Sequence, residues 1–187
     1  FPQSELTLGQ ALLSPTRTYT PLIKILQSSL AGKIKGYVHC TGGGQTKCLK
    51  FGKRLHYFKN NLFPLPPIFS YILETTGYSL RELYPVFNMG HRLEAFVAAE
   101  DVADVLGLAQ SCGIDARLIG SCENSNQAEN RLTITQNEKS YQFAENEICH
   151  LYNHLYIHSS LVHLRKSSNR KIKGGILRVV HDTHITL

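Results

Sequence analysis

The chain has 187 residues, of which 42% are hydrophobic and 18% charged, the ordinary composition of a folded domain. No apolar run approaches the ~20 residues that a membrane span needs, and no charged leader with an apolar stretch stands at the N-terminus, so we expect neither a membrane protein nor a secretory signal. The net charge of +6 indicates an anionic partner, but half of the excess lies beyond Ala144, where the segment 165–173 has the pattern of a solvated basic loop rather than of a nucleic-acid-binding surface.

The first part of the chain predicts a connector, a helix and a strand. Residues 1–13 have the pattern of a connector. Thr20-Pro21 predicts a helix start, because a capping side chain followed by proline is typical of helix N-termini. Apolar residues spaced along one face continue this helix until Gly32, and the run 34–38 predicts a short strand.

Three consecutive glycines, Gly42, Gly43 and Gly44, follow the predicted strand. Glycine has no Cβ, so such a turn can take φ > 0 and bring backbone N–H groups against a ligand. Anions favour such a turn when it opens a helix. The spacing does not match the dinucleotide or P-loop fingerprints. Phosphate binding therefore stays open beside a turn that needs glycine for steric reasons alone, and the Thr41 hydroxyl would either bind phosphate or cap the turn.

The middle of the chain predicts two helices, and the part beyond Gly90 predicts the rest of a sheet. Pro66-Pro67 precedes a helix that ends near Gly77, and Ser79 with Glu82 forms a capping box for a short helix through Phe87. Beyond Gly90 we expect a strand over 93–97, a helix closed by Gly113, a strand over 116–120 and a hairpin of 131–135 with 140–143. Strands interspersed with helices predict an α/β fold with a mixed sheet covered by helices.

Neither the histidines nor the cysteines predict a metal site. His150, His154 and His158 would lie on one face of a helix, and imidazoles suit zinc or nickel. No acidic second shell stands nearby, and an amphipathic surface helix explains the same spacing. Five cysteines without a C-x-x-C pair favour reduced thiols in a cytoplasmic protein over a disulfide framework or a zinc site.

Four segments, in this order and at these distances, carry a family resemblance: Leu13–Tyr19 (LSPTRTY), Val38–Gln45 (VHCTGGGQ), Phe63–Phe69 (FPLPPIF) and Leu83–Gly90 (LYPVFNMG). Together they resemble the C-terminal half of the aminoimidazole ribonucleotide synthetases, also called phosphoribosylformylglycinamidine cyclo-ligases, over about residues 12–143. The resemblance implies an α/β domain of partly ferredoxin-like topology. We therefore expect a connector from a preceding domain over 1–13, the synthetase domain over 14–143, and a basic, His-rich extension over 144–187.

Two departures from the family pattern stand out. The family follows its glycines with a turn that contains Asn-Pro-Arg, whereas this chain has Gln45–Phe51 (QTKCLKF). The family also continues FNMG as FNMGIGM, whereas this chain has His91-Arg92-Leu93. Both departures are more typical of a divergent branch of the family than of a member that has lost its function.

The resemblance implies an ATP-dependent ligase of purine biosynthesis. ATP would phosphorylate the formyl-amide oxygen of formylglycinamidine ribonucleotide, which turns a poor leaving group into a good one, and the amidine nitrogen would then close the imidazole ring. Such chemistry relies on positioning and on groups that neutralise phosphate. The resemblance also implies ATP and Mg²⁺ held mainly by an N-terminal half outside this sequence, supplied in cis or in trans, and a homodimeric, cytoplasmic complete enzyme. The isolated chain is expected to be inactive.

No catalytic residue is predicted, but a phosphate site and a cleft are. We expect contacts to the substrate phosphate at Thr41, Gly42, Gly43 and Gly44, and candidate cleft residues at Arg17, Asn88 and His91. Arg92 with His91 would add positive charge to the cleft. One alternative is a fragment that binds an anion without turnover. Another is a related enzyme such as selenophosphate synthetase, which the pairing of PPIF with FNMG disfavours.

Overall fold

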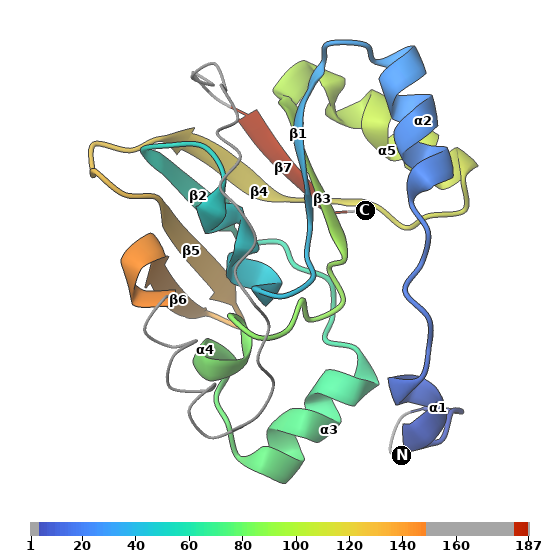
Figure 1. The fold of residues 1–187 in the computed structure, drawn as a ribbon, viewed down its shortest axis with the longest axis vertical. Coiled ribbons are helices and arrows are strands. Elements are labelled where there is room, and N and C mark those ends of the chain that lie inside the picture. The colour runs from blue at the N-terminus through green and yellow to red at the C-terminus, as the bar shows by residue number, and fades with distance from the viewer. Residues whose placement is uncertain (1–3, 149–181, 187) are drawn as a thin grey trace, which may run out of the picture.

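The computed structural model describes residues 4–148 and 182–186, and in that part the chain forms one seven-stranded mixed sheet (Figure 1). The strand order is β1-β3-β7-β4-β2-β5-β6. Only β2 and β5 pair in parallel; the other five pairings are antiparallel. The strands are β1 Ile34–His39, β2 Leu55–Lys59, β3 Leu93–Ala98, β4 Arg117–Asn124, β5 Arg131–Gln136, β6 Lys139–Ala144 and β7 Asp182–Thr186.

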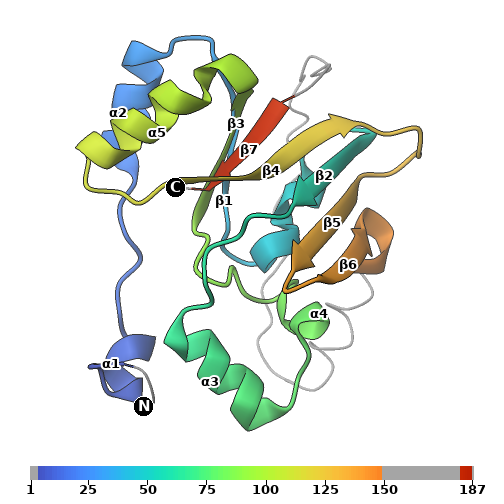
Figure 2. The same cartoon turned by 180° about the vertical axis from the view of Figure 1, so that it is seen from behind.

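Helices cover one face of this sheet at β1 and β3, which confirms the predicted α/β class. Helices α2 (Thr20–Ser29) and α5 (Val102–Ser111) lie side by side there (Figures 1 and 2). Their apolar sides pack on alternate residues of β3 in a buried cluster that includes Leu22, Leu26, Leu93, Ala95, Val97, Val105 and Ala109.

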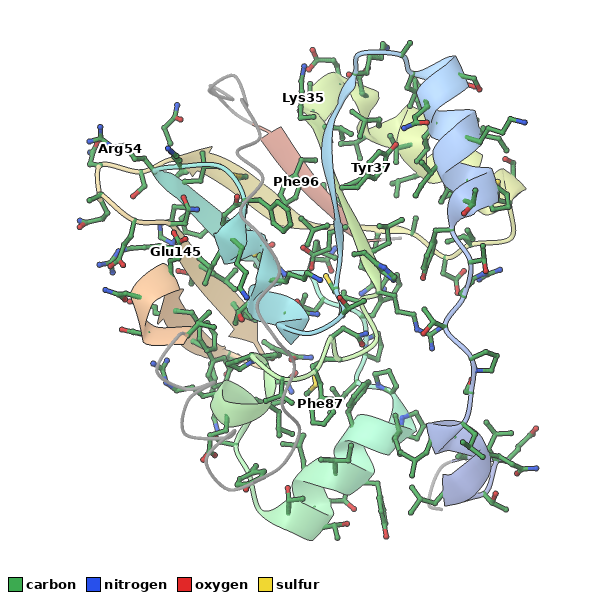
Figure 3. The ribbon with its side chains drawn as sticks, viewed as in Figure 1. Lys35, Tyr37, Arg54, Phe87, Phe96 and Glu145 are labelled. Carbon is green, nitrogen blue, oxygen red and sulfur yellow. The ribbon has the colours of Figure 1, made fainter. Side chains whose placement is uncertain are left out.

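A second core lies on the opposite face. Tyr37 on β1 points toward α2 and α5, whereas Phe96 on β3 points to the other side (Figure 3). This alternation follows from the two-residue period of a strand. The second core is covered by the 3₁₀ helix η1 (Gly44–Lys50) and by α3 (Pro67–Thr76) and α4 (Leu80–Leu83).

Most helix boundaries agree with the predicted signals. The predicted capping box of Ser79 and Glu82 is present at α4. α3 ends at Thr76 and is capped by Gly77, whose φ of 70° is the left-handed conformation that glycine favours. Two details differ. Thr20 is the first residue of α2, with Tyr19 at the cap position and no side-chain cap bond. α4 ends at Leu83, and turns rather than helix lead to Phe87.

Two strands were not predicted. β2 lies in the sheet between β4 and β5. β7, from the segment expected to be an extension, pairs with β3 on one side and β4 on the other. The predicted hairpin of β5 and β6 is present, but it does not complete the sheet. The domain limits at 13 and 143 remain predictions, and His150, His154 and His158 lie outside the described residues.

The predicted connector contains one short helix, α1 (Leu8–Leu12), held by a capping box of Thr7 and Gln10, and it has no buried residue. In the described part of the chain, Cys40, Cys48, Cys112 and Cys122 are free thiols. Across residues 4–148 and 182–186 no helix is long and apolar enough to cross a membrane.

Candidate functional site

The glycine turn, residues 41–44, joins the end of β1 to the start of η1. The Cys40 N–H donates to the carbonyl of Arg92 over 2.8 Å, and the chain then leaves the sheet. Gly43 has a φ of 105°, which a side chain would strain, and the Gly44 N–H closes the turn on the Thr41 carbonyl over 3.0 Å. The predicted strand therefore leads into the glycine turn, and the turn opens a 3₁₀ helix rather than an α-helix.

The outer side of the glycine turn offers hydrogen-bond donors. Thr41 and Gly42 are exposed, whereas Gly43 is buried, and among the described residues nothing accepts from the backbone N–H of Gly42 or Gly43. The ammonium of Lys47 donates to the Thr41 hydroxyl over 2.5 Å, which brings a positive charge to the turn. Free amides beside a lysine are a typical environment for an oxyanion.

The inner side explains why one glycine is sterically required. A Cβ on Gly44 would lie 2.4 Å from the Phe87 carbonyl oxygen and 2.5 Å from that of Tyr84. A Cβ on Gly42 would meet nothing within 4 Å. The two interpretations left open by the sequence therefore apply to different glycines: packing requires Gly44, whereas Gly42 leaves space that a ligand could use.

Asn88 is hydrogen-bonded to the residues on both sides of the glycine turn, Cys40 and Gln45. Its side-chain Nδ2 donates to the Cys40 carbonyl over 3.1 Å, and its Oδ1 accepts from the Gly90 N–H over 3.0 Å. Its carbonyl accepts from Nε2 of Gln45, the first residue after the glycines, over 2.6 Å. Asn88 thus uses its amide within the protein and shapes the turn.

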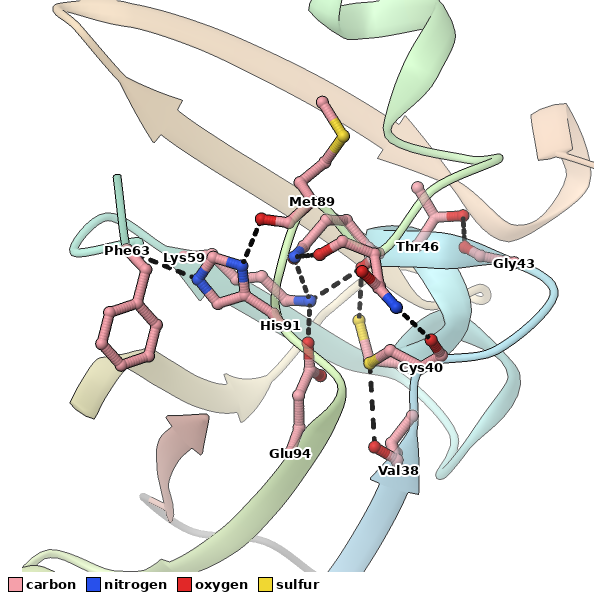
Figure 4. A network of polar contacts seen from close by, with 12 residues as sticks. Val38, Cys40, Gly43, Thr46, Lys59, Phe63, Met89, His91 and Glu94 are labelled. Carbon is pink, nitrogen blue, oxygen red and sulfur yellow. Dashed lines mark hydrogen bonds and ion pairs between the residues drawn. The ribbon is translucent and has the colours of Figure 1, made fainter. Parts of the chain in front are cut away.

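A buried ion pair of Lys59 and Glu94 contacts Gln45 (Figure 4). The Lys59 ammonium is 2.6 Å from a carboxylate oxygen of Glu94, and both side chains are fully buried. The same ammonium donates to the Gln45 carbonyl over 2.7 Å and to its side-chain oxygen over 3.0 Å. The ion pair therefore fixes Gln45, the residue that directly follows the glycine turn.

Lys59 stays charged despite its burial. Burial lowers its pKa, but the neighbouring Cys48 and Glu94 raise it further, and the net pKa is above the ordinary value of 10.5. Burial also raises the pKa of the Cys48 thiol to about 12, so at neutral pH this thiol is uncharged. Glu94 is therefore the group that holds the ammonium in its charged form.

His91 does not supply the charge expected of it. Its ring is buried, Nε2 accepts from the Phe63 N–H over 3.0 Å, and Nδ1 faces the Met89 carbonyl at 3.3 Å. Burial, helped by the charge of Lys59, lowers the pKa of His91 to about 4, so the ring is neutral at pH 7. The His91 side chain is thus buried below the surface, whereas its neighbour Arg92 lines a cavity.

That cavity, here called the arginine pocket, has a volume of about 260 Å³. It brings Arg17, a predicted cleft residue, together with Arg92, but it contains neither the glycine turn nor Asn88 nor His91. It is lined by Arg17, Tyr19, Phe63, Pro66, Gly90, Arg92, Ile114 and Asp115. The pocket adjoins the turn through the Cys40–Arg92 hydrogen bond and through a ring contact of 6.3 Å between Tyr19 and His39.

The acidic and other metal-ligating side chains of the described residues do not gather in one place. Over the residues that the structure describes, no group of three or more His, Cys, Asp or Glu side chains could hold a metal ion. The acidic residues of the two buried or partly buried pairs, Glu94 and Asp101, are each engaged with a lysine.

Comparison with known proteins gives a consistent picture. The family model described as "AIR synthase related protein, C-terminal domain" matches residues 2–131. The phosphoribosylformylglycinamidine cyclo-ligase of Bacillus subtilis is 37% identical over 120 residues, covering 62% of this chain and 34% of the relative. That of Myxococcus xanthus is 37% identical over 121 residues, and that of Methanococcus vannielii 31% over 120, each with 34% of its length covered. The chain thus spans about a third of the length of the curated relatives it matches.

Proposed function

Because the chain belongs to the family of AIR synthase related C-terminal domains, we propose that it is the C-terminal domain of a phosphoribosylformylglycinamidine cyclo-ligase. The complete enzyme would use ATP to convert formylglycinamidine ribonucleotide to aminoimidazole ribonucleotide in purine biosynthesis. The observation that carries the proposal is the family match together with the exposed donors of the glycine turn.

In this proposal the glycine turn binds the phosphate of the ribonucleotide. The ammonium of Lys47 would offset the charge of the phosphate. The amides of Gly42 and Gly43 and the Thr41 hydroxyl would donate hydrogen bonds to its oxygens. Anchoring the substrate at its phosphate fixes the distance to the formyl-amide oxygen and the amidine nitrogen, which must meet in ring closure. No covalent bond to the protein is required.

ATP and Mg²⁺ would be held mainly by a preceding domain. The described residues contain no group of three or more His, Cys, Asp or Glu side chains that could hold a metal ion, and the relatives are about three times as long as the matched segment, which leaves room for such a domain. We further propose that this domain is supplied in cis or in trans, that the complete enzyme is a cytoplasmic homodimer, and that the isolated chain has no ligase activity.

The test joins this chain to an N-terminal domain from the same source and measures steady-state kinetics. Gly42→Val should raise the KM for the ribonucleotide by about tenfold or more, because it blocks the turn without a steric clash inside the fold. The KM for ATP should not change. Gly36→Val is the matched control, since a Cβ there also meets nothing within 4 Å.

A second measurement tests the turn without turnover. Titration of the isolated chain with ribose 5-phosphate should shift the NMR amide signals of Gly42 and Gly43, and Lys47→Gln should weaken this binding while Lys35→Gln on β1 should not. Equal loss of ATP and ribonucleotide affinity in Gly42→Val would contradict the assignment of the turn. An assembled enzyme that binds the phosphate but turns nothing over would instead support an anion-binding module.

A further inference from the structure

We propose that the arginine pocket is a second oxyanion site, which receives the phosphate or carboxylate end of an organic ligand other than the group bound at the glycine turn. The inference goes beyond the proposed function, because it concerns residues that the turn does not use and needs no turnover. It rests on four features of the pocket: its position, its charge, the convergence of its donors and its rigid apolar wall.

Four segments far apart in the sequence form the pocket. Arg17 and Tyr19 come from the stretch before α2, and Phe63 and Pro66 from the loop after β2. Gly90 and Arg92 precede β3, and Ile114 and Asp115 follow α5. Arg17 is fixed across 96 residues of sequence by a hydrogen bond of 2.9 Å to the Gly113 carbonyl.

The pocket carries an excess of positive charge. Its lining holds two guanidinium groups and one carboxylate, that of Asp115, and His91 behind it is neutral. The ion pairs of the described residues lie elsewhere, so Asp115 forms no ion pair with either arginine. Each guanidinium has five N–H donors. Among the described residues Arg17 uses one acceptor and Arg92 has no side-chain acceptor, so donors remain for a ligand.

Both arginines line the same cavity as Tyr19. Burial raises the pKa of Tyr19, and the charges of Arg92 and Arg17 oppose this rise, in keeping with their place in one lining. Two cations and a hydroxyl therefore gather in one concave surface. Guanidinium groups bind phosphates and carboxylates through paired hydrogen bonds, which explains the ligand class.

The apolar part of the lining is held in place. Arg117 lies over the Phe63 ring at 4.7 Å, and the Phe63 N–H is fixed by His91. Gly90 has a φ of 95°, and a Cβ there would lie 2.8 Å from Pro66, so the backbone packs tightly against that proline. A cavity of about 260 Å³ is smaller than a typical pocket for a whole nucleotide. The pocket therefore fits the anionic end of a ligand whose next atoms are apolar.

The experiment titrates the full chain separately with inorganic phosphate, pyrophosphate and acetate, and follows the NMR signals of the Arg17 and Arg92 side chains and of the Gly90 amide. Arg92→Gln should weaken binding at the pocket by about tenfold or more. Arg54→Gln removes the same charge from an exposed loop at the opposite edge of the molecule (Figure 3) and should change the affinity less than twofold. The relative affinities for phosphate and acetate identify which oxyanion the site prefers.

Two further variants keep the inference falsifiable. Asp115→Asn removes the acidic residue of the lining and should strengthen phosphate binding, a gain that misfolding cannot produce. Lys47→Gln at the glycine turn should leave the pocket signals unchanged, so failure of the turn and failure of the pocket can be told apart. The inference is overturned if no oxyanion shifts the pocket signals, if Arg54→Gln weakens binding as much as Arg92→Gln, or if Asp115→Asn weakens it.

Discussion

Removing the ammonium of Lys59 tests whether the buried ion pair holds the site together. Lys59→Met keeps the apolar stem of the side chain but takes the positive charge away from Glu94, 2.6 Å distant. It also removes the donor that the Gln45 carbonyl accepts over 2.7 Å. The carboxylate and the carbonyl both lie where water cannot replace the lost ammonium.

The expected loss is large because neither side chain is exposed. Removing one partner of a buried ion pair costs about 3–5 kcal/mol, out of a total stability of about 5–15 kcal/mol for a domain. In a chain of this size each kcal/mol lowers the melting temperature by about 2–4 °C, so Lys59→Met should lower it by roughly 6–20 °C.

The assay is urea and thermal unfolding followed by far-UV circular dichroism, since the chain has no tryptophan to report by fluorescence. Lys33→Met is the control, because Lys33 also lies 2.6 Å from a carboxylate, that of Asp101, but is half-exposed. The control should melt closer to the unaltered chain than Lys59→Met does, because the half-exposed Lys33 ammonium is largely solvated even when paired.

The double variant Lys59→Met/Glu94→Leu separates the charge from the packing. Replacing both partners by apolar residues leaves no buried charge, so this variant should recover most of the lost stability. The reasoning is refuted if Lys59→Met melts like the Lys33→Met control. It is also refuted if the double variant is as unstable as the single one.

Three further predictions concern His91, the glycine turn and β7. The pKa of His91 falls from 6.5 to about 4 on folding. Its contribution of roughly 3 kcal/mol to the free energy of unfolding should therefore be present above pH 6.5 and be lost as the pH falls toward 4. Urea unfolding of His91→Gln should lack that part of the acid dependence. Gly44→Ala should lower stability by about 1–3 kcal/mol through its clash with the Phe87 carbonyl, whereas Gly42→Ala should melt unchanged; equal melting temperatures would show that the turn relaxes. Ending the chain after Ile148 should speed amide hydrogen exchange in β3 and β4 by removing β7, and unchanged protection would favour the domain limit at residue 143.

The elements that the sequence predicted are those whose signals are local. The period of apolar residues and the flanking glycines and prolines locate α2 and α3, and the Ser79–Glu82 spacing locates α4. Each of these signals lies within about ten residues and needs no knowledge of the rest of the fold.

The strand β2 was missed because its pattern makes sense only in three dimensions. Its inward positions are Leu55, Tyr57 and Lys59, and a lysine in that place contradicts the alternation expected of a strand. The fold resolves this contradiction, because Glu94 pairs with the Lys59 ammonium inside the protein. Glu94, however, is 35 residues away along the sequence. An inward-facing charge that completes an alternating pattern is a signal to search for a buried partner.

The candidate site was predicted in part for the same reason. The glycine turn lies in one short stretch of sequence and could be found there. The different roles of Gly42 and Gly44 depend on the carbonyls of Tyr84 and Phe87, which only the fold brings near. The sequence likewise gives no sign that His91 is buried while the adjacent Arg92 reaches the pocket beside Arg17.

The place of β7 between β3 and β4 has a consequence for how the chain folds. Of the six strand pairings within residues 4–148 and 182–186, only the β5–β6 hairpin joins neighbouring segments. The pairings β1–β3, β2–β4, β2–β5, β3–β7 and β4–β7 all join distant ones. Folds dominated by such distant pairings reach the native state slowly, typically in milliseconds to seconds. On the ribosome, the hairpin can form early, but the gap between β3 and β4 closes only after residues 182–186 have left the exit tunnel. Until then two unpaired strand edges are exposed, which makes the nascent chain vulnerable to aggregation and a candidate client for chaperones.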